Sequence, residues 1–123
     1  KSRALIYSKM VTFGLPIKAH KEIKGLNLKF KNQNLLDHMT DLELIFSMLG
    51  EASATAITKA RDARGLEENK VAARQGGEVA GNARRELESK TGEGVVSDEN
   101  FLDVPEKLKK KRKKLIDSYQ ENN

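Results

Sequence analysis

The stretch from residue 50 to residue 91 most constrains the fold, because it is long, rich in Ala and Gly, and nearly free of large apolar side chains. Its bulky residues are Ile57, Leu66, Val71, Val79 and Leu87. Helices with so few large side chains enclose little core by themselves, so they must be stabilised by packing against something else. The sequence therefore predicts an all-α protein in which small residues let helices approach closely.

A long helix is predicted from Glu67 to Lys90, ended by Thr91-Gly92. Small residues within it recur at steps of three and four, which places them on one helix face. The pair Gly76-Gly77 should weaken the helix by about 1 kcal/mol per Gly relative to Ala. A kink at this pair is the alternative to close packing, which we favour. The candidate surface for self-association or a protein partner is Ala73, Gly77, Ala80, Gly81 and Arg84.

A second long helix is predicted from residue 41 to about residue 60, and its start is marked by a capping box. The Thr40 hydroxyl can accept from the backbone N–H of Glu43, whose carboxylate can accept from the N–H of Thr40. Such a cap typically stabilises a helix by about 1 kcal/mol. The expected buried side of this helix comprises Leu42, Ile45, Phe46, Met48, Leu49, Ala52 and Ala56. The two long helices are expected to form an Ala/Gly-packed hairpin over residues 40–104.

Residues 1–39 are predicted to form a short helical head followed by a connector. Two short helices end at Gly14 and Gly25, and Pro16 suits the first turn of the second helix. This outline is that of a helix-turn-helix, with Lys18, Lys21 and Lys24 along one side of its second helix as candidate phosphate contacts. An ordinary surface helix shows the same pattern. Residues 26–39 are expected to be a loop with at most one helical turn.

Charge divides the chain into three parts. The net charge is +6 in residues 1–39, −5 in residues 40–104 and +4 in residues 105–123, which gives +5 for the whole chain. The last part is a basic tail, helical or disordered, which can contact nucleic acid or an acidic protein surface or simply be solvated. Its candidate nucleic-acid contacts are Lys109, Lys110, Lys111, Arg112 and Lys113.

Residues that could perform catalysis are scarce. The chain has no Cys and only two histidines, His20 and His38, for which helix-end or surface contacts are the expected role. No metal-ligand spacing and no phosphate-binding glycine loop occurs, so we expect no metal, no cofactor and no enzymatic activity. A chain without Cys suits a reducing cytoplasm, and no apolar run reaches the roughly 18 residues of a membrane span. Because it begins at Lys1 rather than Met, we expect it to be part of a longer protein.

Several segments together resemble a known family. They are Lys24-Gly25-Leu26, the run Asn34–Leu44, Leu49-Gly50-Glu51-Ala52, Gly65–Asn69, Ala72-Ala73, Gly76–Arg84, Thr91-Gly92, Val95-Val96-Ser97 and Asn100-Phe101-Leu102. This pattern resembles the C-terminal region of the bacterial DNA damage-inducible protein D family. It also resembles related prophage antirepressor-type proteins, which carry a Bro-type N-terminal domain.

The resemblance implies a cytoplasmic bacterial or prophage protein of the DNA-damage (SOS) response that acts by binding. It supplies no catalytic residues, and the Bro-type domain, the usual DNA-binding candidate of the family, is not in this chain. Two hypotheses follow. The first is an interaction module that docks on a repressor, on a recombinase or on its own copy, without small molecule or membrane. The alternative is a nucleic-acid-binding module that uses the basic head and tail.

Overall fold

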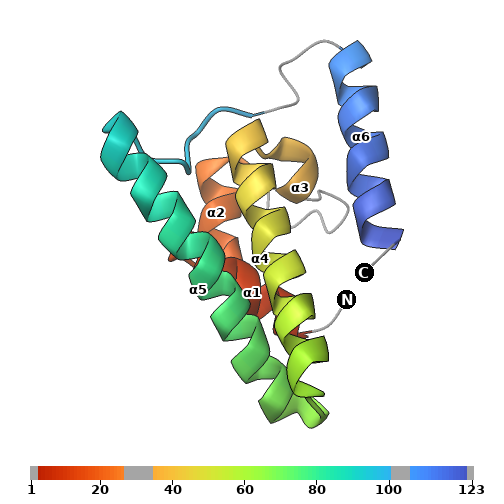
Figure 1. The fold of residues 1–123 in the computed structure, drawn as a ribbon. Helices are drawn as coiled ribbons and strands as arrows, with labels where there is room; N and C mark the ends of the chain where they lie inside the picture. Colours follow the sequence, from red (N-terminus) through yellow and green to blue (C-terminus); the bar gives the residue numbers. More distant parts are fainter. Residues whose placement is uncertain (1–2, 27–34, 101–105, 122–123) are drawn as a thin grey trace.

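The computed structural model describes residues 3–26, 35–100 and 106–121, and this part of the chain is helical without strands (Figure 1). The all-α class predicted from the sequence is confirmed. The helices are α1 (Arg3–Phe13), α2 (Ile17–Ile23), α3 (Leu35–His38), α4 (Asp41–Arg61), α5 (Gly65–Thr91) and α6 (Glu106–Glu121).

The two long helices α4 and α5 form the predicted hairpin, joined by residues 62–64. The capping box at the start of α4 is present: the Glu43 N–H donates to Thr40 Oγ1 at 3.4 Å, and the Thr40 N–H donates to Glu43 Oε1 at 2.9 Å. Helix α5 continues unbroken through the glycine pair and ends at Gly92, whose φ of 76° is the left-handed conformation that glycine adopts easily. The predicted bounds of both helices are therefore close to those observed.

Helix α1 packs against both long helices, so three helices meet where their side chains are smallest (Figure 1). A Cβ atom on Gly76 would lie 2.7 Å from the Ala54 Cβ atom, and one on Gly77 would lie 2.6 Å from the carbonyl oxygen of Ser8. A Cβ atom on Gly50 would lie 2.5 Å from Thr12 Oγ1. Real Cβ atoms do not approach neighbours this closely. We call this contact between α1, α4 and α5 the glycine seam, and it confirms the prediction of close packing without a kink.

The prediction of the buried side of α4 is largely wrong. Phe46 is buried and Met48 is half-buried, whereas the other predicted members are exposed: Leu42, Ile45, Leu49, Ala52 and Ala56. The face that packs inward instead consists of Glu43, Leu44, Phe46, Ser47, Gly50, Glu51 and Ala54. Small side chains on this face allow α1 and α5 to approach, and the two carboxylates on it are ion-paired.

The large apolar core lies beside the seam rather than within it. It joins residues of α1, α3, α4 and α6 to three loop positions: Phe13, Leu26, Leu35, Leu36, Met39, Leu44, Phe46, Val95 and Ile116. These residues come from both sides of the expected boundaries at 39/40 and 104/105, so head, hairpin and tail contribute to one cluster.

The head and the connector follow the sequence closely in the described residues. Helices α1 and α2 end before Gly14 and Gly25, both with positive φ, and Pro16 is the N-cap of α2 rather than its first helical residue. The connector holds one helical turn, α3, while residues 27–34 lie outside the described residues. The expected start of the tail at Pro105 and the pair Phe101-Leu102 also lie outside them; the tail itself is helical in α6.

At the glycine seam, replacing Gly by Ala should destabilise the protein, although the same change normally stabilises a helix. Gly76→Ala should lower the free energy of unfolding by about 2–3 kcal/mol, because the added methyl overlaps Ala54, although Ala alone favours a helix by about 1 kcal/mol. Ser89→Ala, at an exposed position of the same helix, should be neutral or slightly stabilising. Urea unfolding of both variants measures the difference. A Gly76→Ala protein at least as stable as the wild type would contradict the seam.

Candidate functional site

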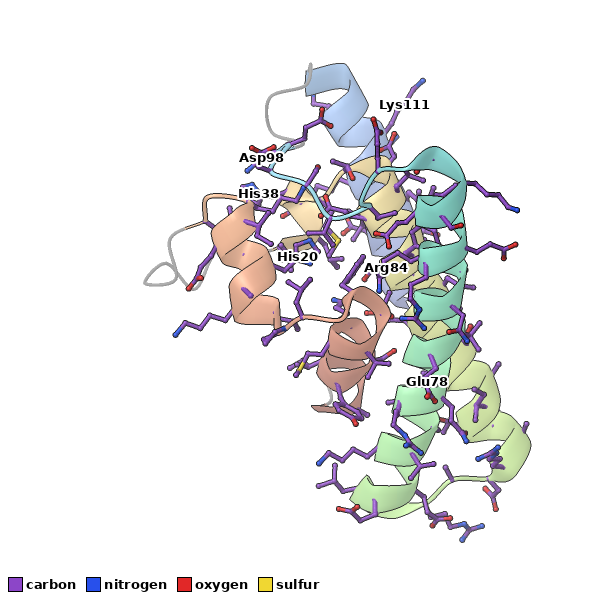
Figure 2. All side chains as sticks on the ribbon, turned by 90° about the vertical axis from the view of Figure 1, so that its left-hand side faces the viewer. His20, His38, Glu78, Arg84, Asp98 and Lys111 are labelled. Atoms are coloured by element: carbon purple, nitrogen blue, oxygen red, sulfur yellow. The ribbon has the colours of Figure 1, made fainter. Side chains whose placement is uncertain are left out.

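The predicted self-association face of α5 is covered by the rest of the chain. Ala73, Gly77, Ala80 and Gly81 are buried against α1 and α4. Arg84 is half-buried: its Nε donates to the carbonyl oxygen of Thr12 at 2.8 Å, and its Nη1 pairs with Glu88 at 2.8 Å (Figure 2). The close packing expected of these residues thus occurs within one chain, and its four Ala and Gly members are buried there.

The three head lysines do not share one exposed face. Lys18 is exposed and Lys21 is half-buried, but the Lys24 side chain is buried, with its ammonium paired to Glu43 and donating to the carbonyl oxygen of Glu99. An ammonium held in this way cannot reach a phosphate. The prediction of Lys24 as a nucleic-acid contact is therefore corrected, and the head retains Lys18 and Lys21.

Glu43 is the centre of a buried ionic cluster that links α2 to the start of α4. His20 Nε2 lies 2.6 Å from Glu43 Oε2, and the ammonium of Lys24 contacts the other carboxylate oxygen. Burial by itself raises the pKa of Glu43. Hydrogen bonds from His20, Lys24 and the Thr40 N–H outweigh burial, and together they hold the pKa of this carboxyl below its usual range.

The cluster continues to the segment that follows α5. Asn100 Nδ2 donates to the carbonyl oxygen of Lys24 at 3.1 Å, and Asn100 Oδ1 lies 3.0 Å from His38 Nδ1. Of the two roles expected of the histidines, the helix-end contact is found: His20 and His38 lie in the last turns of α2 and α3, and both are buried rather than at the surface. The ring of His20 also packs edge-on against Phe13. The side chains of this cluster are each hydrogen-bonded or ion-paired to another member of it, so they form a structural network that joins α2, α3, α4 and residue 100: His20, Lys24, His38, Glu43 and Asn100.

The exposed apolar residues of α4 lie on a single side of the helix. We call five of them the α4 stripe: Leu42, Ile45, Leu49, Ala52 and Ala56. Ala60, near the end of the helix, is exposed as well. The exposed fractions are 46% for Leu42, 56% for Ile45 and 36% for Leu49. Isolated exposed apolar residues are common, but a continuous apolar row on one helix face is typical of an interface.

At its N-terminal end the α4 stripe meets an acidic groove. The groove has a volume of about 590 Å³ and is lined by Thr40, Asp41, Leu42, Glu93, Gly94, Val95, Ser97, Asp98, Glu99 and Asn100. Four of these side chains are carboxylates. The opposite end of the stripe is followed by two cations, Lys59 and Arg61, in the last turn of α4. The stripe is therefore apolar in its middle and oppositely charged at its two ends.

The tail helix carries exposed cations. In α6 the lysines at positions 110, 111, 113 and 114 are exposed, whereas Ile116 is buried in the core. Lys109 and Arg112 lie within α6, and their side chains fall outside the described residues. Of the two states expected of the tail, helical or disordered, the described residues show the helix, and its lysines present charge to solvent.

Within residues 3–26, 35–100 and 106–121, no group of three or more His, Asp or Glu side chains is arranged to hold a metal ion. Over the same residues, no helix is both long enough and apolar enough to cross a membrane.

Comparison of the chain with models of protein families, with curated proteins and with solved structures gives no match.

Sequence reasoning missed both the ionic cluster and the α4 stripe. The capping box pointed to Glu43, but nothing local to residue 43 indicates that residues 20 and 24 of the head pair with it. The stripe was detectable by its spacing, and the error lay in assigning it to the inside of the fold.

The ionic cluster predicts a pH-dependent loss of stability. Glu43→Gln keeps the shape of the capping residue but leaves the Lys24 charge buried without its partner, which should cost about 3–5 kcal/mol at pH 7. Since the pKa of Glu43 is lowered on folding, its contribution is complete above the ordinary glutamate pKa of about 4.3 and is lost as pH falls through the lowered value. The difference between wild type and variant should therefore shrink in acid.

The matched control is Glu51→Gln. Glu51 is also buried on α4, but its partner Lys9, 3.5 Å away, is partly exposed and can turn to water. We expect a loss of about 1 kcal/mol or less. Urea unfolding between pH 7 and pH 3 measures both variants, and equal losses at pH 7 would refute the assignment.

Proposed function

We propose that this chain is a protein-interaction module without enzymatic activity, which docks on another protein through the α4 stripe. The observation that carries the proposal is the exposure of Leu42, Ile45 and Leu49 on one face of a helix whose other face is packed. Burial of such side chains contributes about 25 cal/mol per Å² of apolar area, which makes this face a source of binding energy for a partner.

The arrangement of polar groups supports binding over catalysis. The buried His20, Glu43 and Lys24 contact one another rather than an open site, and the Ala/Gly face of α5 is occupied by α1 and α4. The resemblance to the DNA damage-inducible protein D family would place the partner, a repressor or a recombinase, in the bacterial cytoplasm during the DNA-damage response.

A charge placed in the middle of the α4 stripe should abolish docking without unfolding the chain. Ile45→Glu is the test variant, because Ile45 is the most exposed large residue of the stripe. Ile6→Glu is the matched control, because Ile6 is 48% exposed on α1, which packs on the inward face of α4. Circular dichroism should show equal helicity for both variants.

The measurement is affinity capture from extracts of DNA-damaged bacterial cells with a tagged chain. Proteins retained by the wild type and by Ile6→Glu, and lost with Ile45→Glu, support the proposal. Identical sets of captured proteins for all three chains would refute docking through the α4 stripe.

Nucleic-acid binding is the second candidate, favoured by the exposed lysines of α6. Replacing Lys110, Lys111, Lys113 and Lys114 by Ala should weaken duplex binding. It should also reduce the slope of log affinity against log salt concentration by up to about 0.9 per lost phosphate contact. Replacing Lys18 and Lys21 by Ala tests the head separately. Gel-shift titrations at two salt concentrations measure both sets, and a wild-type chain that binds no nucleic acid at about 50 mM salt removes this candidate.

A further inference from the structure

The α4 stripe has the spacing of a coiled-coil seam. Its residues are separated alternately by three and four positions, and Lys59 continues the series. Residues at this spacing fall on the a and d positions of a heptad, which form the contact line between paired helices. The six residues of this series, at positions 42, 45, 49, 52, 56 and 59, are all exposed. Within the described residues, therefore, no other helix covers this contact line of α4.

Side-chain size changes along the contact line. The three residues of its N-terminal half are large, Leu42, Ile45 and Leu49, and the next two, Ala52 and Ala56, are small. A helix that complements this shape must be small where α4 is large and large where α4 is small. The same helix running in the opposite direction has this property.

We propose that the α4 stripe docks on the α4 stripe of a second copy of this chain, with the two helices antiparallel. This inference rests on the proposed function and names its partner. The two-fold axis passes midway between Leu49 and Ala52. Each d position then meets an a position of the second copy, as the layers of an antiparallel pair require: Leu49 faces Ala52, Ile45 faces Ala56, and Leu42 faces the methylene stem of Lys59.

A parallel arrangement fits the same residues poorly. It would place Leu42, Ile45 and Leu49 against themselves and Ala52 and Ala56 against themselves. The helix axes would then have to be far apart at one end and close at the other. In the antiparallel pair the Leu49–Ala52 and Ile45–Ala56 layers each combine one large and one small residue, so the helix spacing is the same across these four central layers.

Charge favours the same direction. The acidic end of the stripe, with Asp41 and the groove residues Glu93, Asp98 and Glu99, would lie beside Lys59 of the second copy. Each chain supplies one acidic and one basic end, so opposite charges meet at both ends of the antiparallel pair. A parallel pair would bring like charges together at both ends.

The packing prediction is tested by exchanging the large and the small residue of one layer, Ile45 and Ala56. Ile45→Ala alone leaves a gap and Ala56→Ile alone crowds the layer, so each should weaken dimerisation about tenfold or more. The double variant restores one large and one small residue per layer and should regain most of the affinity. Sedimentation velocity over about 1–100 µM chain measures the monomer–dimer equilibrium.

The direction is tested by single cysteines, which report without ambiguity because the chain has no Cys. With a rise of 1.5 Å per residue, position 52 and its own copy are about 5 Å apart along the axis, while position 59 and its copy are about 25 Å apart. A short bismaleimide should therefore cross-link Ala52→Cys and not Lys59→Cys. Equal cross-linking at both positions would indicate a parallel pair and overturn the proposal.

Two further outcomes would also overturn it: a chain that is monomeric throughout the concentration range, and a double variant no tighter than the single ones. If the chain is monomeric but Ile45→Glu still abolishes capture of another protein, the interaction module stands and only the second copy is excluded. If dimerisation and capture are both unaffected by Ile45→Glu, both proposals fall.

Discussion

The direct approach of three helix backbones at the glycine seam is the constraint on which the rest of the structure depends. Gly50, Gly76 and Gly77 leave no room for a Cβ atom, so α1, α4 and α5 touch along their smallest faces. Dispersion contacts between closely packed atoms replace the large apolar side chains that usually stabilise a helical hairpin. Because the part of α4 that meets the seam is small or polar, Leu42, Ile45 and Leu49 are left outside, while Leu44 and Phe46 reach the apolar core beside the seam. The apolar surface that we propose for docking is thus a direct result of how the interior is packed.

The Glu43 cluster adds a second constraint, which fixes the head on the hairpin. One carboxylate completes the capping box of α4, contacts His20 of α2 and pairs with Lys24. Asn100 then connects the backbone of Lys24 to His38. Four segments distant in the sequence are therefore joined by one polar network, in which Glu43 holds His20 and Lys24, and Asn100 links Lys24 to His38.

Much of the fold followed from local rules. The Thr40–Glu43 box, the glycines after α1 and α2, and the stop at Gly92 each act within a few residues, so the helix ends could be predicted from the sequence. The side of α4 that faces inward could not be predicted in this way. Apolar residues at helical spacing show the same pattern whether they pack within their own chain or against another molecule. Lys24 failed as a predicted phosphate contact for a related reason. Its position every third residue with Lys18 and Lys21 says nothing about Glu43, which lies 19 residues further along the chain.

Opposite faces of α4 should respond to substitution by different rules. At Gly50, as at Gly76 and Gly77 of α5, the volume of the side chain decides whether a substitution is tolerated. Even a single Cβ atom overlaps a neighbouring atom there, whatever the polarity of the side chain. At Ile45 and Ala56, which are exposed, the isolated chain has space for larger side chains, and in the proposed pair apolar character and size relative to the facing layer would matter. A change that leaves the folded monomer intact can therefore be the one that removes its interaction, whereas the mildest change on the other face can unfold it. Sequence variation among proteins that share this hairpin should show the same division, with strict conservation of size inside and of apolar character outside.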